Sequence, residues 1–215
     1  MRFGSRTDAG CLLGRELAGR NLKADIVVGL PRGGVVVAAE VARILQLPLD
    51  VIAVRKIGHP WHREFAVGAL AEGGVTVLDK PALEGNPVSR TELVAVIAEE
   101  TQRLLDYQAR FHGGAKPELA GRRVVIVDDG LVTGATMEAA VQSARQQKAG
   151  CVVVAVPVAS TEAVHRLARE ADEVIALVTD PDFCAVGSYY REFSQTTDEE
   201  VLALLRNQGD EPPKT

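Results

Sequence analysis

The stretch that decides the fold reads Arg-Arg-Val-Val-Ile-Val-Asp-Asp-Gly-Leu-Val-Thr-Gly-Ala-Thr-Met, residues 122–137. Four apolar, β-branched residues, 124–127, have the length and composition of a strand that is buried on both faces, as in a parallel sheet. Asp128 and Asp129 end this strand, small and hydroxyl residues follow, and apolar residues recur at helical spacing from Met137. The sequence therefore predicts a strand, a tight loop and the start of a helix.

The side chains of this loop favour a phosphorylated sugar. A loop of this kind directs backbone N–H groups and the hydroxyls of Thr133 and Thr136 into one concavity at the positive end of a helix, which suits a phosphate. Two adjacent carboxylates suit vicinal sugar hydroxyls, because they accept hydrogen bonds from both. The alternative is a turn at the end of the sheet with no ligand. Neither the nucleoside triphosphatase loop nor a dinucleotide-binding Gly-x-Gly-x-x-Gly after a strand is present in the sequence.

Residues 124–137 resemble the phosphoribosyl diphosphate (PRPP) motif of the type I phosphoribosyltransferases. The resemblance implies that Asp128 and Asp129 bind the ribose hydroxyls. It assigns the 5-phosphate to the phosphate loop, which we define as Gly130, Leu131, Val132, Thr133, Gly134, Ala135 and Thr136.

Length, composition and charge narrow the class of protein. A chain of 215 residues that is 47% apolar can form one α/β domain with a full core. The net charge of −5 argues against a general nucleic-acid surface, which needs clustered Lys and Arg. The three cysteines, Cys11, Cys151 and Cys184, lack metal-ligand spacing and fit a reducing compartment. Without a cleavable leader or a long apolar run, the expected location is cytoplasmic.

Strand and helix patterns alternate along the chain. Strands are expected at 25–30, 49–54, 124–127, 151–156 and 174–178, and helices at 7–18, 35–45, 89–111, from about 134, and 161–170. We therefore expect an open parallel sheet of about five strands with helices on both faces, and ligands at the carboxyl ends of the strands. Residues 65–70 and 75–78 indicate a hairpin or two edge strands. A single domain is expected over 1–206, with a polar tail at 207–215.

A second loop with anion-binding character follows the first predicted strand. It comprises Leu30, Pro31, Arg32, Gly33 and Gly34. The glycines let the backbone approach a ligand closely, and the Arg32 guanidinium suits phosphate oxygens. By itself this segment is equally well a plain turn. The resemblance implies that it binds the pyrophosphate of PRPP.

Residues 55–64 are rich in charge, with Gly and Pro between, which predicts a mobile loop. The resemblance implies a flexible loop over about 55–68 that closes on the reacting centre, with Arg55 and Lys56 contacting pyrophosphate. His59 and His62 are either acid–base groups or neither. Trp61 either covers a ligand or pins the loop to its own domain.

Residues 179–196 concentrate aromatic side chains in a chain that is only 4% aromatic. The resemblance implies a hood here, in which Phe183 stacks on a nucleobase with Tyr189 and Tyr190 behind it. A small satellite core at the end of the sheet explains the same residues equally well.

Two departures from the family bear on the acceptor. The 6-oxopurine enzymes carry a carboxylate just before Thr-Gly in the phosphate loop, where this chain has Val132. They also carry a Lys near the end of the next strand, where this chain reads Val-Pro-Val-Ala-Ser at 156–160. Hypoxanthine and guanine are therefore disfavoured, and the acceptor stays open.

The resemblance implies a Mg²⁺-dependent transfer of the 5-phosphoribosyl group from PRPP, the co-substrate, to a nucleobase or other acceptor. The implied catalytic residues are Asp128, Asp129, Arg32 and Lys56. Mg²⁺ would be held mainly through PRPP, near the two aspartates, without a direct protein ligand. The expected partners are PRPP and a small acceptor, with no nucleic acid and no membrane, and a homodimer is open. The rival hypotheses are a non-catalytic PRPP- or nucleotide-binding regulator and a sugar-phosphate hydrolase.

Overall fold

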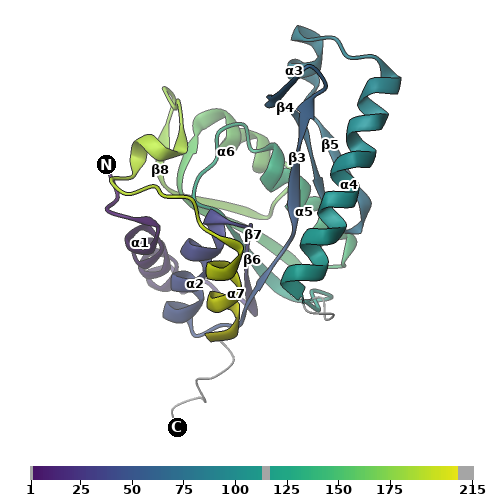
Figure 1. The fold of residues 1–215 in the computed structure, drawn as a ribbon. Helices are drawn as coiled ribbons and strands as arrows, with labels where there is room; N and C mark the ends of the chain where they lie inside the picture. Colours follow the sequence, from purple (N-terminus) through teal and green to yellow (C-terminus); the bar gives the residue numbers. More distant parts are fainter. Residues whose placement is uncertain (1, 113–116, 208–215) are drawn as a thin grey trace.

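A computed structural model describes residues 2–112 and 117–207 (Figure 1). Its main sheet has five parallel strands in the order β2-β1-β6-β7-β8. These strands are β1 (Ile26–Gly29), β2 (Leu49–Val51), β6 (Arg123–Val127), β7 (Cys151–Ser160) and β8 (Glu173–Asp180). The predicted α/β class with about five parallel strands is confirmed.

Both faces of the main sheet are buried. Successive residues of a strand point to opposite faces, so alternate side chains belong to each face. Val27, Val125 and Val153 lie in register and face the helices α1 (Arg6–Gly19), α2 (Gly33–Leu45) and α7 (Asp198–Asn207). Val124 and Val154 face α5 (Ala135–Gln146) and α6 (Thr161–Leu167). Helices therefore cover both faces, as the sequence predicted.

A second, antiparallel sheet packs beside the first in the order β3-β4-β5. Its strands are β3 (Val54–His59), β4 (His62–Ala71) and β5 (Val75–Leu78), and a short helical turn, η1 (Glu72–Gly74), joins β4 to β5. Helix α5 lies between the two sheets, in one apolar cluster with Ala69 and Val77 of the second sheet and Ile126 of the first (Figure 1). The long helix α4 (Arg90–His112) covers the other side of the second sheet, against Ile57 and Val67.

The second sheet corrects two expectations. Residues 49–54 were expected to form one strand, but β2 ends at Val51, and β3 begins at Val54 in the other sheet. Residues 55–64 were expected to be a mobile loop, yet they form strands of a hairpin that turns at Pro60 and Trp61. Apolar Ile57 is fully buried under α4, and this burial stabilises strand structure in a segment whose composition indicates a loop.

Three smaller differences concern helices. Helix α1 begins at Arg6, one residue before the expected start, and Ser5 caps it by accepting a hydrogen bond from the Asp8 N–H at 3.2 Å. A short helix for which none was expected, α3 (Lys80–Gly85), follows β5. Helix α7 was not anticipated, although the reciprocal hydrogen bonds between Thr197 and Glu200 form the capping box that its sequence spells out.

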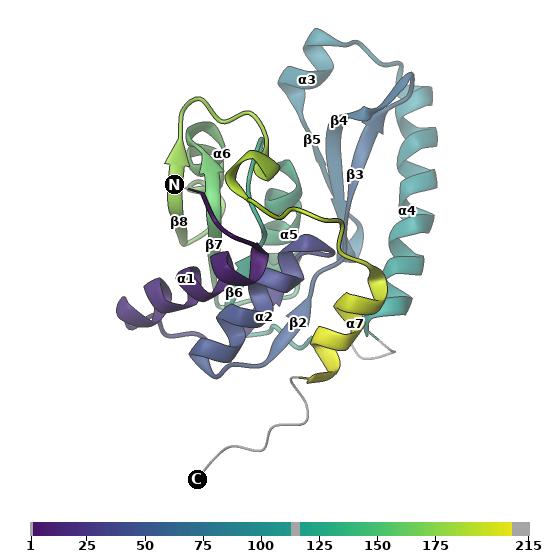
Figure 2. The same ribbon diagram turned by 60° about the vertical axis from the view of Figure 1, so that its left-hand side comes forward.

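The segment after β8 returns across the carboxyl end of the sheet (Figure 2). It contains the short helical turn η2 (Val186–Tyr189) and then runs beside the N-terminal segment. The Phe3 N–H donates to the Tyr189 carbonyl at 2.7 Å, and the Arg191 N–H donates to the Phe3 carbonyl at 2.9 Å. The N-terminus therefore holds the expected hood segment in place. No helix within the described residues is both long and apolar enough to cross a membrane. The predicted tail falls almost wholly at 208–215, outside the described residues.

Candidate active site

The acidic pair lies at the carboxyl end of β6, the central strand. The Asp129 N–H donates to Asp128 Oδ1 at 2.8 Å, and Asp129 Oδ2 accepts from Arg6 Nε at 2.7 Å. Burial and the neighbouring charge of Asp129 raise the pKa of Asp128 well above its usual range. Burial also raises the pKa of Asp129, although Arg6 opposes that shift. The two carboxylates are thus held close together where their charge is costly, as expected of groups kept for a ligand.

The phosphate loop, residues 130–136, runs from β6 into α5. Leu131 is buried, and its backbone pairs with β7: its N–H donates to the Val158 carbonyl at 3.0 Å, and its carbonyl accepts from the Ser160 N–H at 2.9 Å. Gly134 has φ of 77°, which favours glycine, and it leads directly into α5. Within the described part of the chain, the N–H groups of residues 132–134 have no hydrogen-bond acceptor. These donors lie at the positive end of a helix and are suited to an anion.

The loop 30–34 lies directly against the acidic pair. A methyl group added to Gly34 would lie 2.6 Å from Asp128 Oδ1, and one added to Gly33 would overlap Asp129. The peptide bond between Pro31 and Arg32 is cis. The structure therefore brings together the two loops that the sequence analysis selected, about 100 residues apart. The side chains of Leu30 and Leu131, both predicted site residues, are buried in the core and face away from a ligand.

The basic side chains near the acidic pair are not equally available to bind a ligand. Arg55 donates to Glu100 Oε2 through Nη2 at 2.8 Å and through Nε at 3.0 Å, and Glu100 is buried. Arg55 is thus part of an ion pair between β3 and α4, which the sequence analysis did not foresee. Arg32 is 3.9 Å from Asp198 Oδ1 and is partly exposed. Lys56 is exposed, and its charge favours ionisation of both aspartates, acting to lower their pKa values.

A cavity of about 760 Å³ opens between the loop 30–34, the hairpin and α4. Five basic side chains and three acidic ones line it: Arg32, Arg55, Lys56, Arg63 and Arg103, with Glu64, Glu99 and Glu100. The excess of positive charge is suited to a polyanion beside the acidic pair. Arg32, Arg55 and Lys56 thus line the same cavity, and the sequence analysis had assigned all three to pyrophosphate.

The aromatic residues of the hood segment contact each other. Phe183 stacks on Tyr189 with ring centroids 5.0 Å apart, and the Tyr189 hydroxyl donates to Asp180, which raises the pKa of Tyr189 to about 12. Tyr190 is buried against Phe3, and its hydroxyl donates to the Asp129 carbonyl at 2.6 Å. Tyr190 therefore belongs to a satellite core, and base stacking remains a proposal for Phe183.

The histidines and the tryptophan of the hairpin contact one another rather than the acidic pair. His59 is buried, and its Nδ1 accepts from the Trp61 N–H at 3.2 Å. Its ring stacks on His62 at 5.7 Å. Trp61 is 73% exposed, and its side chain reaches Glu92 at the start of α4, where its hydrogen bond helps to lower the pKa of that carboxyl. Acid–base roles for these histidines therefore receive no geometric support.

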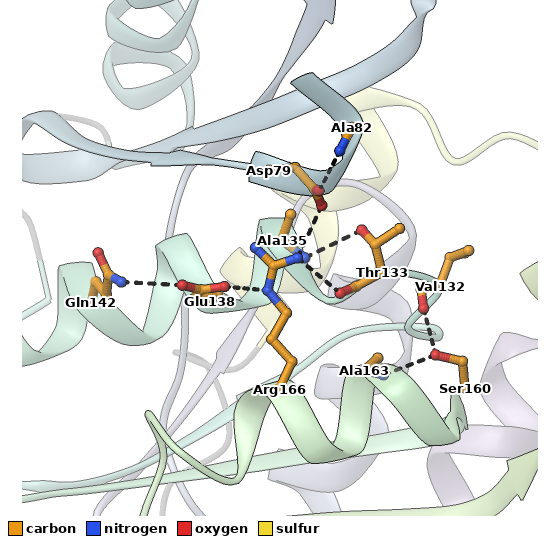
Figure 3. Close-up of polar contacts among 10 residues, drawn as sticks. All are labelled: Asp79, Ala82, Val132, Thr133, Ala135, Glu138, Gln142, Ser160, Ala163 and Arg166. Carbon is orange, nitrogen blue, oxygen red and sulfur yellow. Dashed lines mark hydrogen bonds and ion pairs between the residues drawn. The ribbon is translucent and has the colours of Figure 1, made fainter. Parts of the chain in front are cut away.

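Sequence reasoning missed Arg6, which contacts three parts of the site. Besides its bond to Asp129, Nη1 donates to the Ser194 carbonyl at 2.6 Å, and the guanidinium lies 3.8 Å from the centre of the Phe193 ring. A lone Arg at the start of a helix carries no local signal of this role. Sequence reasoning also missed Ser160 and Arg166, which contact backbone carbonyls of the phosphate loop (Figure 3).

The side chains of the site offer few ligands to a metal ion. No group of three or more His, Cys, Asp or Glu side chains in the described residues is arranged to hold one. Two carboxylates beside a cavity lined by basic side chains fit Mg²⁺, which prefers oxygen ligands and commonly takes most of them from phosphates and water.

Comparison with known proteins identifies the family. Residues 12–186 match the model described as the phosphoribosyl transferase domain. Because that match spans most of the chain, the protein belongs to the phosphoribosyltransferase family.

The chain is similar to particular members. It is 47% identical over 207 residues to Rv0571c of Mycobacterium tuberculosis (strain ATCC 25618 / H37Rv), which is provisionally named a phosphoribosyl transferase. The match covers 94% of this chain but 46% of that protein, so the chain spans about half the length of the curated relatives it matches. The crystal structure of TT1426 from Thermus thermophilus is 48% identical, with a TM-score of 0.77 over 97% of this chain and 99% of that one. AQ2163 from Aquifex aeolicus, at 15% identity and a TM-score of 0.51 over 81% and 74% of the two chains, shares the fold.

Proposed function

We propose that this domain transfers the 5-phosphoribosyl group from PRPP to a nitrogenous acceptor and releases pyrophosphate. The observation that carries the proposal is the position of the acidic pair. Asp128 and Asp129 lie between the phosphate loop, where the N–H groups of residues 132–134 have no acceptor in the described chain, and residues 30–34, here named the glycine loop, which border the basic cavity. The 5-phosphate, ribose and pyrophosphate of PRPP would occupy these three places in the same order.

Catalysis in this arrangement would come from alignment and charge. The aspartates would hold the ribose hydroxyls and stabilise positive charge that develops on the sugar. Arg32 and Lys56 would hold the departing pyrophosphate, with Arg55 available after it exchanges Glu100 for the ligand. Mg²⁺, when bound, would neutralise part of the pyrophosphate charge, near Asp128 and Asp129.

The acceptor would approach from the hood, where Phe183 and Tyr189 lie. Val132 is 44% exposed in the phosphate loop and has no group to exchange a proton with a purine nitrogen. This supports an acceptor other than a 6-oxopurine. Whether two copies of the chain form a homodimer is a separate proposal, which sedimentation would test.

The double variant Asp128→Asn/Asp129→Asn tests the proposal. We expect pyrophosphate release from PRPP, Mg²⁺ and a panel of nucleobases to fall by at least about a hundredfold while the fold survives. Asp106→Asn is the matched control, because Asp106 is exposed on α4, away from the acidic pair, and accepts a hydrogen bond from Gln102. Unchanged activity in the double variant would remove the mechanism.

A regulator that binds PRPP or a nucleotide without turnover is the second candidate. The observation that favours it is that charged side chains of the site already neutralise each other within the protein. Asp129 pairs with Arg6, and Arg55 pairs with Glu100. Tight PRPP binding without pyrophosphate release, for any acceptor in the panel, would favour the regulator. Pyrophosphate release without any acceptor would instead favour a hydrolase.

A further inference from the structure

The carbonyl side of the phosphate loop is held by the β7–α6 turn. Ser160 Oγ donates to the Val132 carbonyl at 2.5 Å and also accepts from the Ala163 N–H at 3.0 Å, so its position is fixed from both sides. Arg166 Nη1 makes a longer contact, 3.5 Å, with the Thr133 carbonyl (Figure 3). Two consecutive carbonyls are therefore engaged, while the N–H groups of the same residues have no acceptor within the described residues.

Arg166 is itself fixed by two carboxylates. Its Nε pairs with Glu138 in the first turn of α5, and its Nη1 pairs with Asp79 Oδ2 at 3.0 Å. All three side chains are largely buried, with exposed fractions of 26% for Arg166, 15% for Glu138 and 12% for Asp79. A forked guanidinium between two carboxylates has little freedom, so the loop carbonyl meets a preorganised cation.

Asp79 connects this cluster to the second sheet. It follows β5, its N–H donates to the Val67 carbonyl at 2.9 Å, and its Oδ1 accepts from the Ala82 N–H at 3.1 Å at the start of α3. The two oxygens of the Asp79 carboxylate thus serve the start of α3 and Arg166 separately, while its backbone N–H pairs with β4 of the second sheet. Figure 3 shows Asp79, Glu138 and Thr133 converging on Arg166 from three different segments.

We propose that Ser160 and Arg166 are positioning residues that hold the phosphate loop in its anion-binding shape, and that Asp79 couples this loop to the second sheet. The inference rests on the proposed function, because it takes the loop to bind the 5-phosphate. Neither residue touches the ligand. Their effect is to fix the loop before binding, so that ordering it does not reduce the affinity.

Titration calorimetry with two probes separates positioning from general damage. Ribose 5-phosphate would occupy the phosphate loop, whereas magnesium pyrophosphate would occupy the glycine loop and the basic cavity. We expect Arg166→Gln to weaken ribose 5-phosphate binding about tenfold, which corresponds to about 1.4 kcal/mol, and to leave pyrophosphate binding within about twofold. Ser160→Ala should act in the same direction.

Matched variants sharpen the test. Arg145→Gln removes an arginine that lies away from the loop and pairs with Asp172 at 2.8 Å. It should leave the affinities for both probes unchanged. Arg166→Lys keeps the charge but cannot make the fork, so a partial loss is expected. Asp79→Asn keeps the acceptor for Ala82 and removes the ion pair, so it carries the test if Arg166→Gln does not fold. Combined with Arg166→Gln, it should add little further loss.

Each outcome decides the proposal. Unchanged ribose 5-phosphate affinity in folded Arg166→Gln and Asp79→Asn overturns the positioning role. Equal losses for both probes also overturn it, because the effect is then not confined to the loop. A wild-type protein that binds ribose 5-phosphate but never releases pyrophosphate from PRPP overturns the transferase and leaves this inference intact. A wild-type protein that does not bind ribose 5-phosphate overturns both.

Discussion

Asp128 shows how a candidate ligand residue reduces the stability of the fold. Its carboxyl is buried beside a second carboxyl, and both effects raise its pKa. Its one close hydrogen bond in the described chain comes from the Asp129 N–H, which only partly offsets the shift. The folded state therefore disfavours the ionised form of Asp128 relative to the unfolded chain, so ionisation of this carboxyl costs folding free energy.

We predict that Asp128→Asn raises the melting temperature at about pH 7 by about 2–4 °C, the change that ~1 kcal/mol produces in a chain of this size. Asparagine keeps the acceptor for the Asp129 N–H and removes the buried charge. The pKa of Asp128 is higher in the folded state than in the unfolded state. The free-energy cost of its buried charge is therefore complete above the folded-state pKa and disappears as pH falls to about 4. The gain should shrink over the same range in thermal unfolding scans. A lower melting temperature at neutral pH would contradict this account. PRPP affinity should fall in parallel.

At the scale of elements, the site depends on the close approach of α2 to the end of β6. A methyl group on Gly34 would lie 2.9 Å from Asp128 Cα and 3.1 Å from the Val127 carbonyl, and neither backbone atom can move aside cheaply. The absence of a side chain at Gly34 therefore sets the distance between the two predicted ligand loops.

We predict that Gly34→Ala lowers the free energy of unfolding by about 1–2 kcal/mol, because overpacking outweighs the gain in helix propensity. PRPP affinity should fall as well, since Asp128 must shift. Gly19→Ala at the end of α1 is the control: a methyl group there meets nothing within 4 Å, and stability should be equal or higher by up to about 1 kcal/mol. Denaturant titration and calorimetry with PRPP would measure both effects. Equal behaviour of the two variants would show that the loop contact is not tight.

The end of α4 is fixed to the junction of the two sheets by a buried ionic cluster. His112 Nε2 lies 2.6 Å from Glu72 Oε1, and its Nδ1 lies 3.5 Å from Asp50 Oδ1. Burial alone would lower the pKa of His112, but the two carboxylates outweigh it and raise the pKa to about 9. His112 is therefore charged in the folded protein at neutral pH.

This cluster predicts a loss of stability in mild alkali. The folded pKa of His112 exceeds its unfolded value of about 6.5, so its contribution is complete below about pH 6.5 and is lost as pH rises through about 9. The loss should be on the order of 3 kcal/mol in denaturant titrations, because one pKa unit corresponds to about 1.4 kcal/mol. In His112→Gln the slope over this range should be absent. A slope equal to that of the wild type would assign the pH dependence to other groups.

For the whole molecule, the shared position of α5 means that the two sheets are not independent. Its apolar residues form one cluster with both sheets, and Arg166 adds a polar connection between the second sheet and the phosphate loop. We predict a single cooperative thermal transition, with calorimetric and van't Hoff enthalpies that agree. A separate early transition, accompanied by hydrogen exchange confined to residues 54–78, would show that the second sheet unfolds alone.

Much of this architecture is predictable from local pattern. Continuous β-branched runs such as 124–127 identify the buried parallel strands, because only strands covered on both faces can lack polar residues. The motif from Asp128 to Thr136 predicts a ligand loop for the same local reason. The capping box at Thr197 could have revealed α7 as well, since its two hydrogen bonds join residues three apart.

The remaining features depend on contacts between distant residues. The charge-rich segment 55–64 forms strands because Ile57 is buried under α4 and Arg55 meets Glu100, 45 residues away. Arg6 reaches Asp129 across 123 residues, and Arg166 reaches Asp79 across 87. The sequence by itself thus determined the parallel sheet and selected the two candidate ligand loops, whose signals lie within short stretches of chain. Only the tertiary structure decided which side chains neutralise and support those loops, because burial and charge pairing arise between segments that become neighbours when the chain folds.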